Sequence, residues 1–279
     1  MLLVVVPAVA TDATLKSLWW AQQSSQVAVW VIGLSVVLGL ITWQVRAATP
    51  AAAWTGTAIT ASLMYSTAGF PYQPWHTALT PILAVSLLAY VSTRIGRGRK
   101  ERLGIGEQRS GRSAAQVAAN LGVAALLATD FAQSSMAGLH WFAGFRPEQA
   151  VLFVAGLAAL AEAAADTVSS ELGEVFGGRP RMITTLRSVD PGTDGAISMA
   201  GTVAGVAAAG MVAALGAYAL RAPVAAFEIA WAGGAFGLLL DSLLGATLEQ
   251  AGWLNNDAVN FVSTIGAAAG AVAAMVWVR

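Results

Sequence analysis

Residues 162–198 combine the side-chain types that bind metal ions and phosphate groups. This stretch reads EAAADTVSSELGEVFGGRPRMITTLRSVDPGTDGAIS and holds carboxylates, arginines, hydroxyls and a glycine turn. Carboxylates bind hard cations, arginines bind phosphate oxygens, and the backbone N–H groups of a glycine-containing turn can bind an anion. The stretch therefore predicts a site for phosphate and a divalent metal.

Helical spacing sorts the acidic candidates. Glu162, Asp166 and either Ser169 or Ser170 follow the i, i+4, i+7/8 spacing, so they share one face of a helix. Glu171 points roughly 140° away from Asp166 on an ideal helix. It can join Asp166 at a metal only if the helix unwinds before Gly173. Asp166 is the leading candidate, because packing alone also explains a residue such as Glu162.

The loop 173–195 supplies candidates for phosphate binding and would close over the site. Arginines suit bidentate contacts with phosphate oxygens, and a Pro-Gly turn offers amides and a hydroxyl. The candidates are Arg179, Arg181, Thr184, Thr185, Arg187, Gly192, Thr193 and Gly195. A Pro-Gly turn alone binds nothing in most proteins, so it gains meaning here from its neighbours.

Composition indicates where this chemistry takes place. The chain is 57% hydrophobic and 11% charged, with a mean hydropathy of +0.66, and its apolar residues form long blocks. These values are typical of a multi-span membrane protein. The sequence has no cysteine and two histidines, which excludes thiol chemistry and disulfides and argues against a Cys/His zinc site.

The apolar blocks predict an all-α transmembrane helix bundle. Each block is close to the ~20 residues that cross a bilayer, which gives about eight spans. The predicted spans are 28–46, 51–69, 74–93, 113–131, 149–172, 196–220, 223–248 and 257–278. They form a single transmembrane catalytic domain, 28–279, preceded by an interfacial or partly inserted segment, 1–27.

The distribution of basic residues predicts the orientation of the bundle. The loop 94–112 is rich in arginine, and the loop 173–195 adds further arginines. By the positive-inside rule these loops, together with 249–256, belong on the cytoplasmic side of the inner membrane. With an even number of spans, both termini then face away from the cytoplasm. Most of 94–112 is explained as a topogenic surface, and Arg112 is its one site candidate.

Polar residues of four spans fall at a similar depth. Asp166 lies about six residues before its span reaches the cytoplasm, roughly 9 Å inside the helix end. Asp241, Asn120 and Asn260 enter from the same side on other spans, with Asn256 nearer the surface. Polar groups in hydrocarbon are expected to face a bundle interior or a water-filled cavity. A cavity open to the cytoplasm is therefore predicted. Taken alone, paired intramembrane carboxylates fit an ion relay in a transporter as well as they fit a metal site.

Several motifs resemble those of the phytyl-phosphate kinase family of membrane proteins, which includes transmembrane protein 19. The resemblance runs from about Thr42 to the C-terminus. Its motifs are Ala165-Asp166-Thr167, Ser170-Glu171-Leu172-Gly173, Pro180 to Thr185, Pro191-Gly192-Thr193-x-Gly195, Ser198, Arg112 with Gln116 and Asn120, Asp241 to Thr247, and Asn256 to Phe261. The chain departs from the family pattern at Val168, Arg187 and Ala196. The order of motifs is also similar, more weakly, to CTP-dependent lipid enzymes such as dolichol kinase.

This resemblance implies a kinase that converts an isoprenoid monophosphate into the diphosphate. The phosphoryl donor is a nucleoside triphosphate, and CTP is the one expected. It implies Mg²⁺ on Asp166, Glu171 and Asp241, with Glu162 as a further ligand, and Arg181 as a catalytic contact to phosphate. The residues implied for nucleotide or phosphate binding are Arg112, Asn120, Ser170, Arg179, Thr184, Thr185, Arg187, Gly192, Thr193, Gly195, Asn256 and Asn260. The implied partners are an isoprenoid monophosphate, a nucleoside triphosphate and membrane lipids, and a homodimer is left open.

Two alternatives stand beside this interpretation. A cytidylyltransferase would form a CDP-lipid and pyrophosphate from the same two substrates. A cation-coupled transporter or lipid scramblase would use Asp166 and Asp241 as ion ligands, but the long loop of arginine, threonine and glycine has no obvious use in ion coupling.

Overall fold

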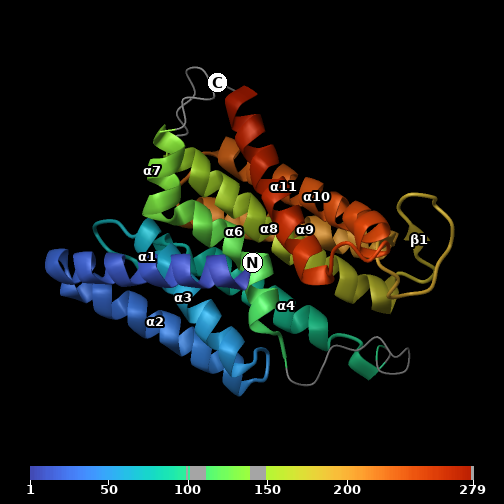
Figure 1. The fold of residues 1–279 in the computed structure, drawn as a ribbon, viewed down its shortest axis with the longest axis horizontal. Helices are drawn as coiled ribbons and strands as arrows, with labels where there is room; N and C mark the ends of the chain where they lie inside the picture. The colour runs from blue at the N-terminus through green and yellow to red at the C-terminus, as the bar shows by residue number, and fades with distance from the viewer. Residues whose placement is uncertain (99, 101–110, 139–148, 278–279) are drawn as a thin grey trace.

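The computed structural model describes residues 1–98, 100, 111–138 and 149–277, and this part of the chain is a bundle of helices (Figure 1). The described elements are α1 (Leu2–Gln23), α2 (Ser25–Gln44), α3 (Pro50–Thr67), the 3-10 turn η1 (Pro74–His76), α4 (Leu79–Arg94), α6 (Ala114–Ala128), α7 (Asp130–Gly138), α8 (Gln149–Phe176), β1 (Arg181–Met182), β2 (Ala196–Ile197), α9 (Met199–Ala219), α10 (Val224–Leu244), the π-helical turn η2 (Gly245–Glu249) and α11 (Asn256–Trp277). Residues 99 and 101–110 of the predicted basic loop lie outside the described residues.

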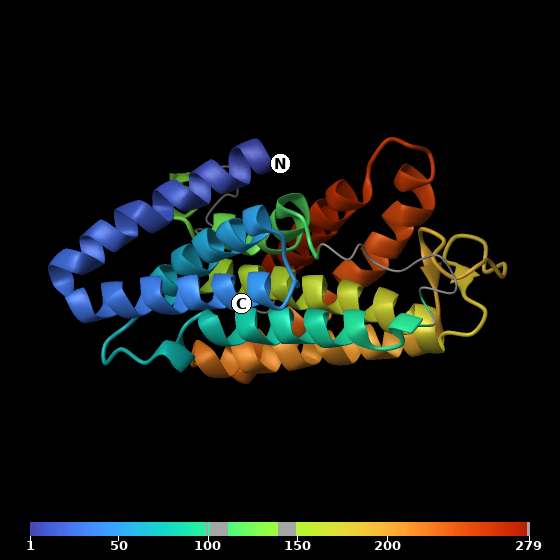
Figure 2. The same ribbon diagram turned by 90° about the horizontal axis from the view of Figure 1, so that it is seen from below.

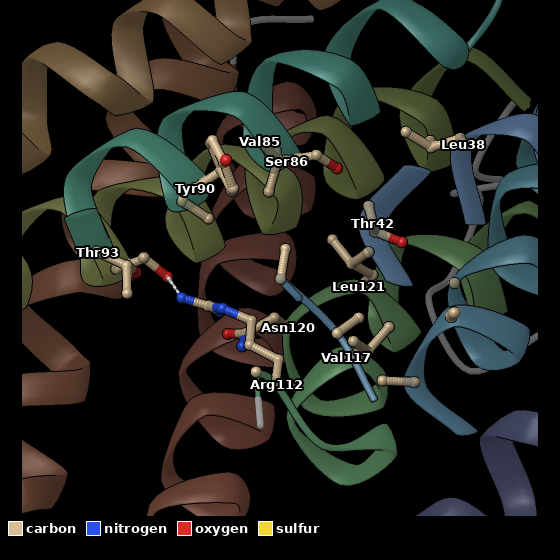
Figure 3. Close-up of a pocket in the computed structure, with 18 of the residues that line it drawn as sticks. Leu38, Thr42, Val85, Ser86, Tyr90, Thr93, Arg112, Val117, Asn120 and Leu121 are labelled. Carbon is tan, nitrogen blue, oxygen red and sulfur yellow. Dashed lines mark hydrogen bonds between the residues drawn. The ribbon is translucent and has the colours of Figure 1, made fainter. Parts of the chain in front are cut away.

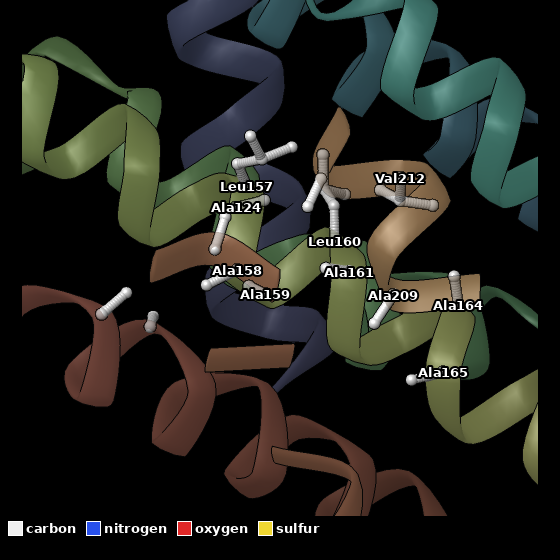
Figure 4. Packing of buried hydrophobic residues seen from close by; sticks show 14 of the residues in the cluster. Ala124, Leu157, Ala158, Ala159, Leu160, Ala161, Ala164, Ala165, Ala209 and Val212 are labelled. Atoms are coloured by element: carbon white, nitrogen blue, oxygen red, sulfur yellow. The ribbon is translucent and has the colours of Figure 1, made fainter. Parts of the chain in front are cut away.

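Helix α8 is the centre of the bundle. It contacts α4, α6, α9, α10 and α11, and the core around it is built largely from alanine. Figure 4 shows Ala158, Ala161 and Ala165 along α8, with Ala209 and Val212 of α9 in the same buried cluster. Small side chains let helix backbones approach closely, which is how helices associate where lipid removes the hydrophobic driving force. The helix that carries Asp166 is therefore enclosed by its neighbours.

Length and composition agree with a membrane bundle. Six helices, α1, α2, α8, α9, the α10–η2 unit and α11, are long and apolar enough to cross a membrane, and α4 and α6 are shorter apolar helices. Large apolar side chains such as Leu239 and Phe236 are exposed, as expected for surfaces that face lipid. The predicted all-α transmembrane bundle is confirmed.

The N-terminal helix α1 belongs to this bundle. Lys16 is buried, and its Nζ lies 3.0 Å from Asp12 Oδ2 and 3.1 Å from Asp130 Oδ1. The same ammonium donates to Ser66 Oγ on α3 at 2.8 Å. A buried charge needs such partners, so this cluster fixes α1 against its neighbours. The interfacial position of residues 1–27 stays a prediction, as does the extent of the catalytic domain.

The region after α8 differs from expectation. Gly173 does not end the helix, which continues to Phe176. Beyond it, β1 and β2 form a small antiparallel pair with Arg181 opposite Ile197. Figure 2 shows α4 beside α8 and α9, with the strands beyond the end of α8 and the turn between α1 and α2 at the other end of the molecule.

Candidate active site

A polar pocket of about 350 Å³ lies where α8 ends. Helices α6, α8, α10 and α11, the turn η2 and residues 191–198 form its walls. The predicted site residues that line it are Arg112, Asn120, Asp166, Ser170, Glu171, Gly192, Thr193, Gly195, Asp241, Asn256 and Asn260. The structure thus brings together polar residues from four helices and one loop.

Carboxylates from α8 and α10 form the floor of this pocket. Asp166 and Asp241 both line it and lie close enough to interact, and Ser170 Oγ lies 3.4 Å from Asp166 Oδ1. Glu162 lies deeper, with its side chain fully buried. Gly237 of α10 makes room for it, because a Cβ at that position would stand 2.4 Å from Glu162 Cγ.

Ser263 of α11 connects two of these carboxylates. Its Oγ lies 2.7 Å from Glu162 Oε1, 3.0 Å from Asp241 Oδ2 and 2.9 Å from the Asn260 carbonyl. A hydroxyl has one hydrogen to donate, so it cannot donate to all three acceptors at once. Glu162 Oε2 has no hydrogen-bond partner within the described residues. The carboxylates of Glu162 and Asp241 therefore have fewer hydrogen-bond donors than their oxygens can accept.

Two asparagines complete the wall formed by α6 and α11. Asn120 Nδ2 donates to the Gln116 carbonyl at 3.0 Å, and Asn120 Oδ1 lies 3.4 Å from the Asn260 amide nitrogen. With its amide turned over, Asn260 donates instead to Asp241 Oδ2 at 3.3 Å and to the Asn256 carbonyl at 3.1 Å. The turned amide gives Asp241 a donor, so we favour that orientation.

Arg112 stands at one edge of the pocket, just before α6. Ser113 begins α6 with a capping box that it forms with Gln116, and the Arg112 N–H donates to the Ala47 carbonyl at 3.0 Å. Its guanidinium lies 3.4 Å from Thr167 Oγ1 on α8. Backbone contacts thus fix the residue while its side chain reaches across to α8.

A second, larger cavity of about 820 Å³ adjoins this edge, between α2, α3, α4, α6 and α8. Arg112, Asn120 and Thr167 line both cavities. Figure 3 shows Arg112 beside Asn120, with the apolar Val117 and Leu121 next to them. The polar pocket therefore adjoins a cavity with largely apolar walls.

The glycine turn is held against η2. Gly195 adopts a φ of +74°, and a Cβ there would stand 2.2 Å from the Ala246 backbone nitrogen, so only glycine fits. Gln250 Nε2 donates to the Asp194 carbonyl at 2.9 Å. These contacts bring Gly192 and Thr193 to the pocket, although the Thr193 hydroxyl itself donates to the Asp190 carbonyl at 2.7 Å.

Glu171 differs from the predicted arrangement. Helix α8 does not unwind before Gly173, so Glu171 keeps its separate direction. Thr93 Oγ1 donates to Glu171 Oε1 at 2.8 Å, and Lys100 forms an ion pair with the other oxygen. The carboxylate ties α4 to α8 at the rim of the pocket. A shared metal site with Asp166 is therefore not what this geometry presents.

The basic and hydroxyl residues of the β1 region also lie elsewhere. Within the described loop, Arg179, Arg181, Thr184, Thr185 and Arg187 are exposed and do not line the pocket. The Arg181 guanidinium donates to the Leu186 carbonyl at 3.3 Å. Pairing with Ile197 holds Arg181 in β1, where its side chain is exposed. These five residues therefore do not join the other site candidates at the pocket.

Some site residues escaped the sequence analysis. Ser263 lies beside Thr264 in an apolar helix, a pattern too common to single out, and Thr167 was noted only as part of the Ala165-Asp166-Thr167 motif. Lys100 was assigned to a topogenic loop, yet its side chain is buried against Glu171. One available signal was the helical spacing of Asn256, Asn260 and Ser263, which places the serine on the face of the two asparagines.

The site was compared with known proteins by sequence. The family model described as integral membrane protein DUF92 matches residues 33–268. The chain belongs to this family. Its motifs pointed to the same family, so that expectation is confirmed.

Three relatives illustrate the range of the family. An uncharacterized membrane protein of Methanocaldococcus jannaschii is 33% identical over 210 residues, which cover 75% of this chain and 79% of the relative. Protein PGR of Arabidopsis thaliana is 27% identical over 238 residues, covering 72% of this chain and 81% of the relative. The chloroplast protein VTE6 of the same plant is 24% identical over 185 residues, covering 65% of this chain and 54% of VTE6. No solved structure matches the chain with significance.

The donor set decides how well a metal fits. Within the described residues, no group of three or more His, Cys, Asp or Glu side chains is arranged as a metal site, so Asp166, Glu171, Asp241 and Glu162 do not form the predicted set. Mg²⁺, however, is usually held by one or two carboxylates together with substrate phosphates and water. Asp166 and Asp241 supply that number, and both face the pocket. The two carboxylates fit an Mg²⁺ ion whose remaining ligands would be phosphate oxygens and water.

Proposed function

We propose that this protein is a membrane-embedded kinase for isoprenoid monophosphates, which uses a nucleoside triphosphate to form the diphosphate. The observation that carries the proposal is the shared edge at Arg112. There a largely apolar cavity inside the bundle meets a polar pocket whose lining includes the carboxylates of Asp166 and Asp241 and a glycine turn. A lipid phosphate and a hydrophilic phosphate donor can meet at such an edge. Membership of the family that the motifs resemble supports the same activity.

Different residues of the pocket would bind the lipid phosphate, the nucleotide and the metal ion. Arg112 would bind and orient the lipid monophosphate, and the turn at Gly192 and Gly195 would bind the phosphates of the nucleotide through backbone amides. Asp166 and Asp241 would hold Mg²⁺, which neutralises charge on the transferring group. Positioning and charge neutralisation are the main demands of this chemistry.

The reaction needs no strong general base. An oxygen of the lipid monophosphate dianion attacks the γ-phosphorus of the nucleotide. The bond from that phosphorus to the β–γ bridging oxygen breaks, and the nucleoside diphosphate leaves with the electron pair. The proposed donor is CTP, and the site is proposed to face the cytoplasm from the inner membrane. The scarcity of histidine is then no obstacle.

The test uses purified full-length protein in detergent with Mg²⁺. A panel of prenyl monophosphates is offered with CTP, ATP, GTP or UTP, and mass spectrometry identifies the products. The proposal predicts a prenyl diphosphate and a nucleoside diphosphate. A CDP-lipid with pyrophosphate would replace kinase activity by cytidylyl transfer. Transport by the protein in liposomes, with no turnover of any prenyl phosphate, would contradict both enzyme assignments.

A further inference from the structure

The larger cavity has an uneven distribution of charge. Its lining includes the apolar side chains Leu38, Ile82, Val85 and Leu121, together with several alanines and glycines. Among the described residues the lining also contains five basic side chains and no acidic one, namely Arg46, Arg94, Arg97, Arg112 and Lys100, the last of which is paired with Glu171. A cavity with apolar walls and a basic end suits an anionic molecule that carries a hydrocarbon chain.

Continuity with the polar pocket indicates where the anionic group would lie. Arg112 and Thr167 line both cavities and lie 3.4 Å apart, so they form the boundary at which the two cavities meet. A phosphate at this boundary would be reached by the Arg112 side chain and would face Asp166 across the polar pocket. The attached chain would extend away from it, past Val117 and Leu121.

We propose that this cavity is the binding site for the isoprenoid tail, which makes the residues of α3 and α4 along its walls the determinants of chain length. The proposal rests on the proposed kinase function. It commits to one occupant, a single prenyl chain whose monophosphate lies at Arg112. The positive charge at the basic end suits a phosphate, and the volume of the rest of the cavity suits one prenyl chain.

The volume sets an upper limit on the chain. At about 30 Å³ for a group the size of a water molecule, 820 Å³ holds roughly 27 such groups. A prenyl monophosphate with about twenty carbons fits within that limit, whereas a chain with about fifty carbons cannot be enclosed. Binding is therefore expected to strengthen with chain length up to geranylgeranyl monophosphate and to gain little beyond it.

Gly56 on α3 offers a way to shorten the cavity. A Cβ at this position would meet its nearest neighbour, Val117 Cγ1, at 3.9 Å, so a side chain can be added without a backbone clash. Gly39 also lines the cavity but is unsuitable, because its Cβ would stand 2.1 Å from Thr57 Oγ1. Gly33 on α2 provides the matched control. It is exposed, it does not line the cavity, and its Cβ would have no neighbour within 4 Å.

The experiment measures binding of geranyl, farnesyl, geranylgeranyl and solanesyl monophosphates to the purified full chain by native mass spectrometry without nucleotide. A leucine at position 56 displaces about three methylene groups of the tail, so Gly56→Leu should weaken geranylgeranyl binding roughly fiftyfold. Geranyl monophosphate also passes Val117, so its binding should weaken as well, but less, because fewer methylene groups of its tail are displaced. Gly33→Leu should behave as wild type. If Gly56→Leu fails to fold, Ala89→Leu fills the cavity from α4 and should shift the preference in the same direction.

The outcomes separate the tail site from the kinase function. If wild type binds geranylgeranyl monophosphate and the cavity variants bind it equally well, the tail site is wrong, whatever the kinase assay gives. A bound two-chain phospholipid that geranylgeranyl monophosphate does not displace would also overturn it, as would failure of wild type to bind any member of the series. If chain-length selection follows position 56 but no diphosphate forms, the tail site stands and the kinase function fails.

Discussion

Ser263 links carboxylates from two helices through a single hydroxyl. Its Oγ lies 2.7 Å from Glu162 Oε1 and 3.0 Å from Asp241 Oδ2, and Glu162 is fully buried. Ser263→Ala removes the donor and leaves a buried carboxyl without it, which costs about 1–3 kcal/mol. We expect a lower melting temperature in detergent. Ser134→Ala, at an exposed position on α7, is the control and should melt like wild type. Equal melting of both variants would remove Ser263 from the network.

Substitution of Arg112 and of Arg181 distinguishes the site seen in the structure from the site predicted from the sequence. Arg112 lines both cavities, whereas Arg181 is exposed on β1 and donates to the Leu186 carbonyl. Loss of one phosphate-binding cation typically lowers turnover by about 10²–10³-fold. We therefore expect that loss for Arg112→Ala and a change within a fewfold for Arg181→Ala, measured as kcat/KM for the prenyl monophosphate. A larger loss in Arg181→Ala would mean that the β1 loop closes over the site during turnover.

At the scale of elements, the cluster around Lys16 is expected to hold α1 in the bundle. Lys16→Met leaves the buried Asp12 beside Asp130 without a cation, and breaking such a buried pair costs about 3–5 kcal/mol. The double variant Asp12→Leu, Lys16→Met removes both charges and should recover most of that loss. Unfolding in detergent, followed by circular dichroism, compares the two. A double variant no more stable than Lys16→Met alone would show that the ion pair does not fix α1.

The helices were largely predictable because their apolar length depends on local composition. The span predicted at 257–278 is α11, Asn256–Trp277, and the one predicted at 51–69 is α3, Pro50–Thr67. The end of α8 was not predictable. Glycine ends many helices. Here Gly173 lets Ser198 approach, since a Cβ on Gly173 would stand 3.1 Å from Ser198 Oγ. The helix therefore runs through the glycine.

The candidate site was predictable only where helical depth decided the outcome. Asp166, Asp241, Asn120 and Asn260 line one pocket because their depths in separate spans are similar. The partners of Glu171 could not be predicted, because Lys100 is 71 residues away in the chain and lies in a segment whose basic residues explain topology equally well. Contacts between distant residues depend on how helices are rotated, and hydropathy does not carry that information.

At the scale of the whole molecule, the proposed orientation places the β1 region in the cytoplasm and the turn between α1 and α2 on the opposite side, as the two lie at opposite ends in Figure 2. The chain has no cysteine, so any maleimide labelling of a variant comes from the introduced cysteine. Thr184→Cys should react with an impermeant maleimide only after spheroplasts are opened. Gln23→Cys should react in intact spheroplasts. The reverse pattern would invert the orientation and move the site to the other side of the membrane.

Turnover by Asp166→Asn tests the proposed kinase function most directly. Asparagine keeps the size of the side chain and one oxygen but removes the charge proposed to hold Mg²⁺, so the fold should survive while transfer fails. The control is Asp190→Asn, an exposed position in the β1 loop that does not line the pocket. The assay is prenyl diphosphate formation from geranylgeranyl monophosphate and CTP, together with melting in the presence and absence of Mg²⁺ and nucleotide.

The account predicts that Asp166→Asn stays monodisperse, loses turnover by several orders of magnitude and loses the stabilisation by Mg²⁺ and nucleotide that wild type and Asp190→Asn retain. Near-normal turnover in Asp166→Asn would contradict it, because the carboxylate floor would then take no part in the reaction.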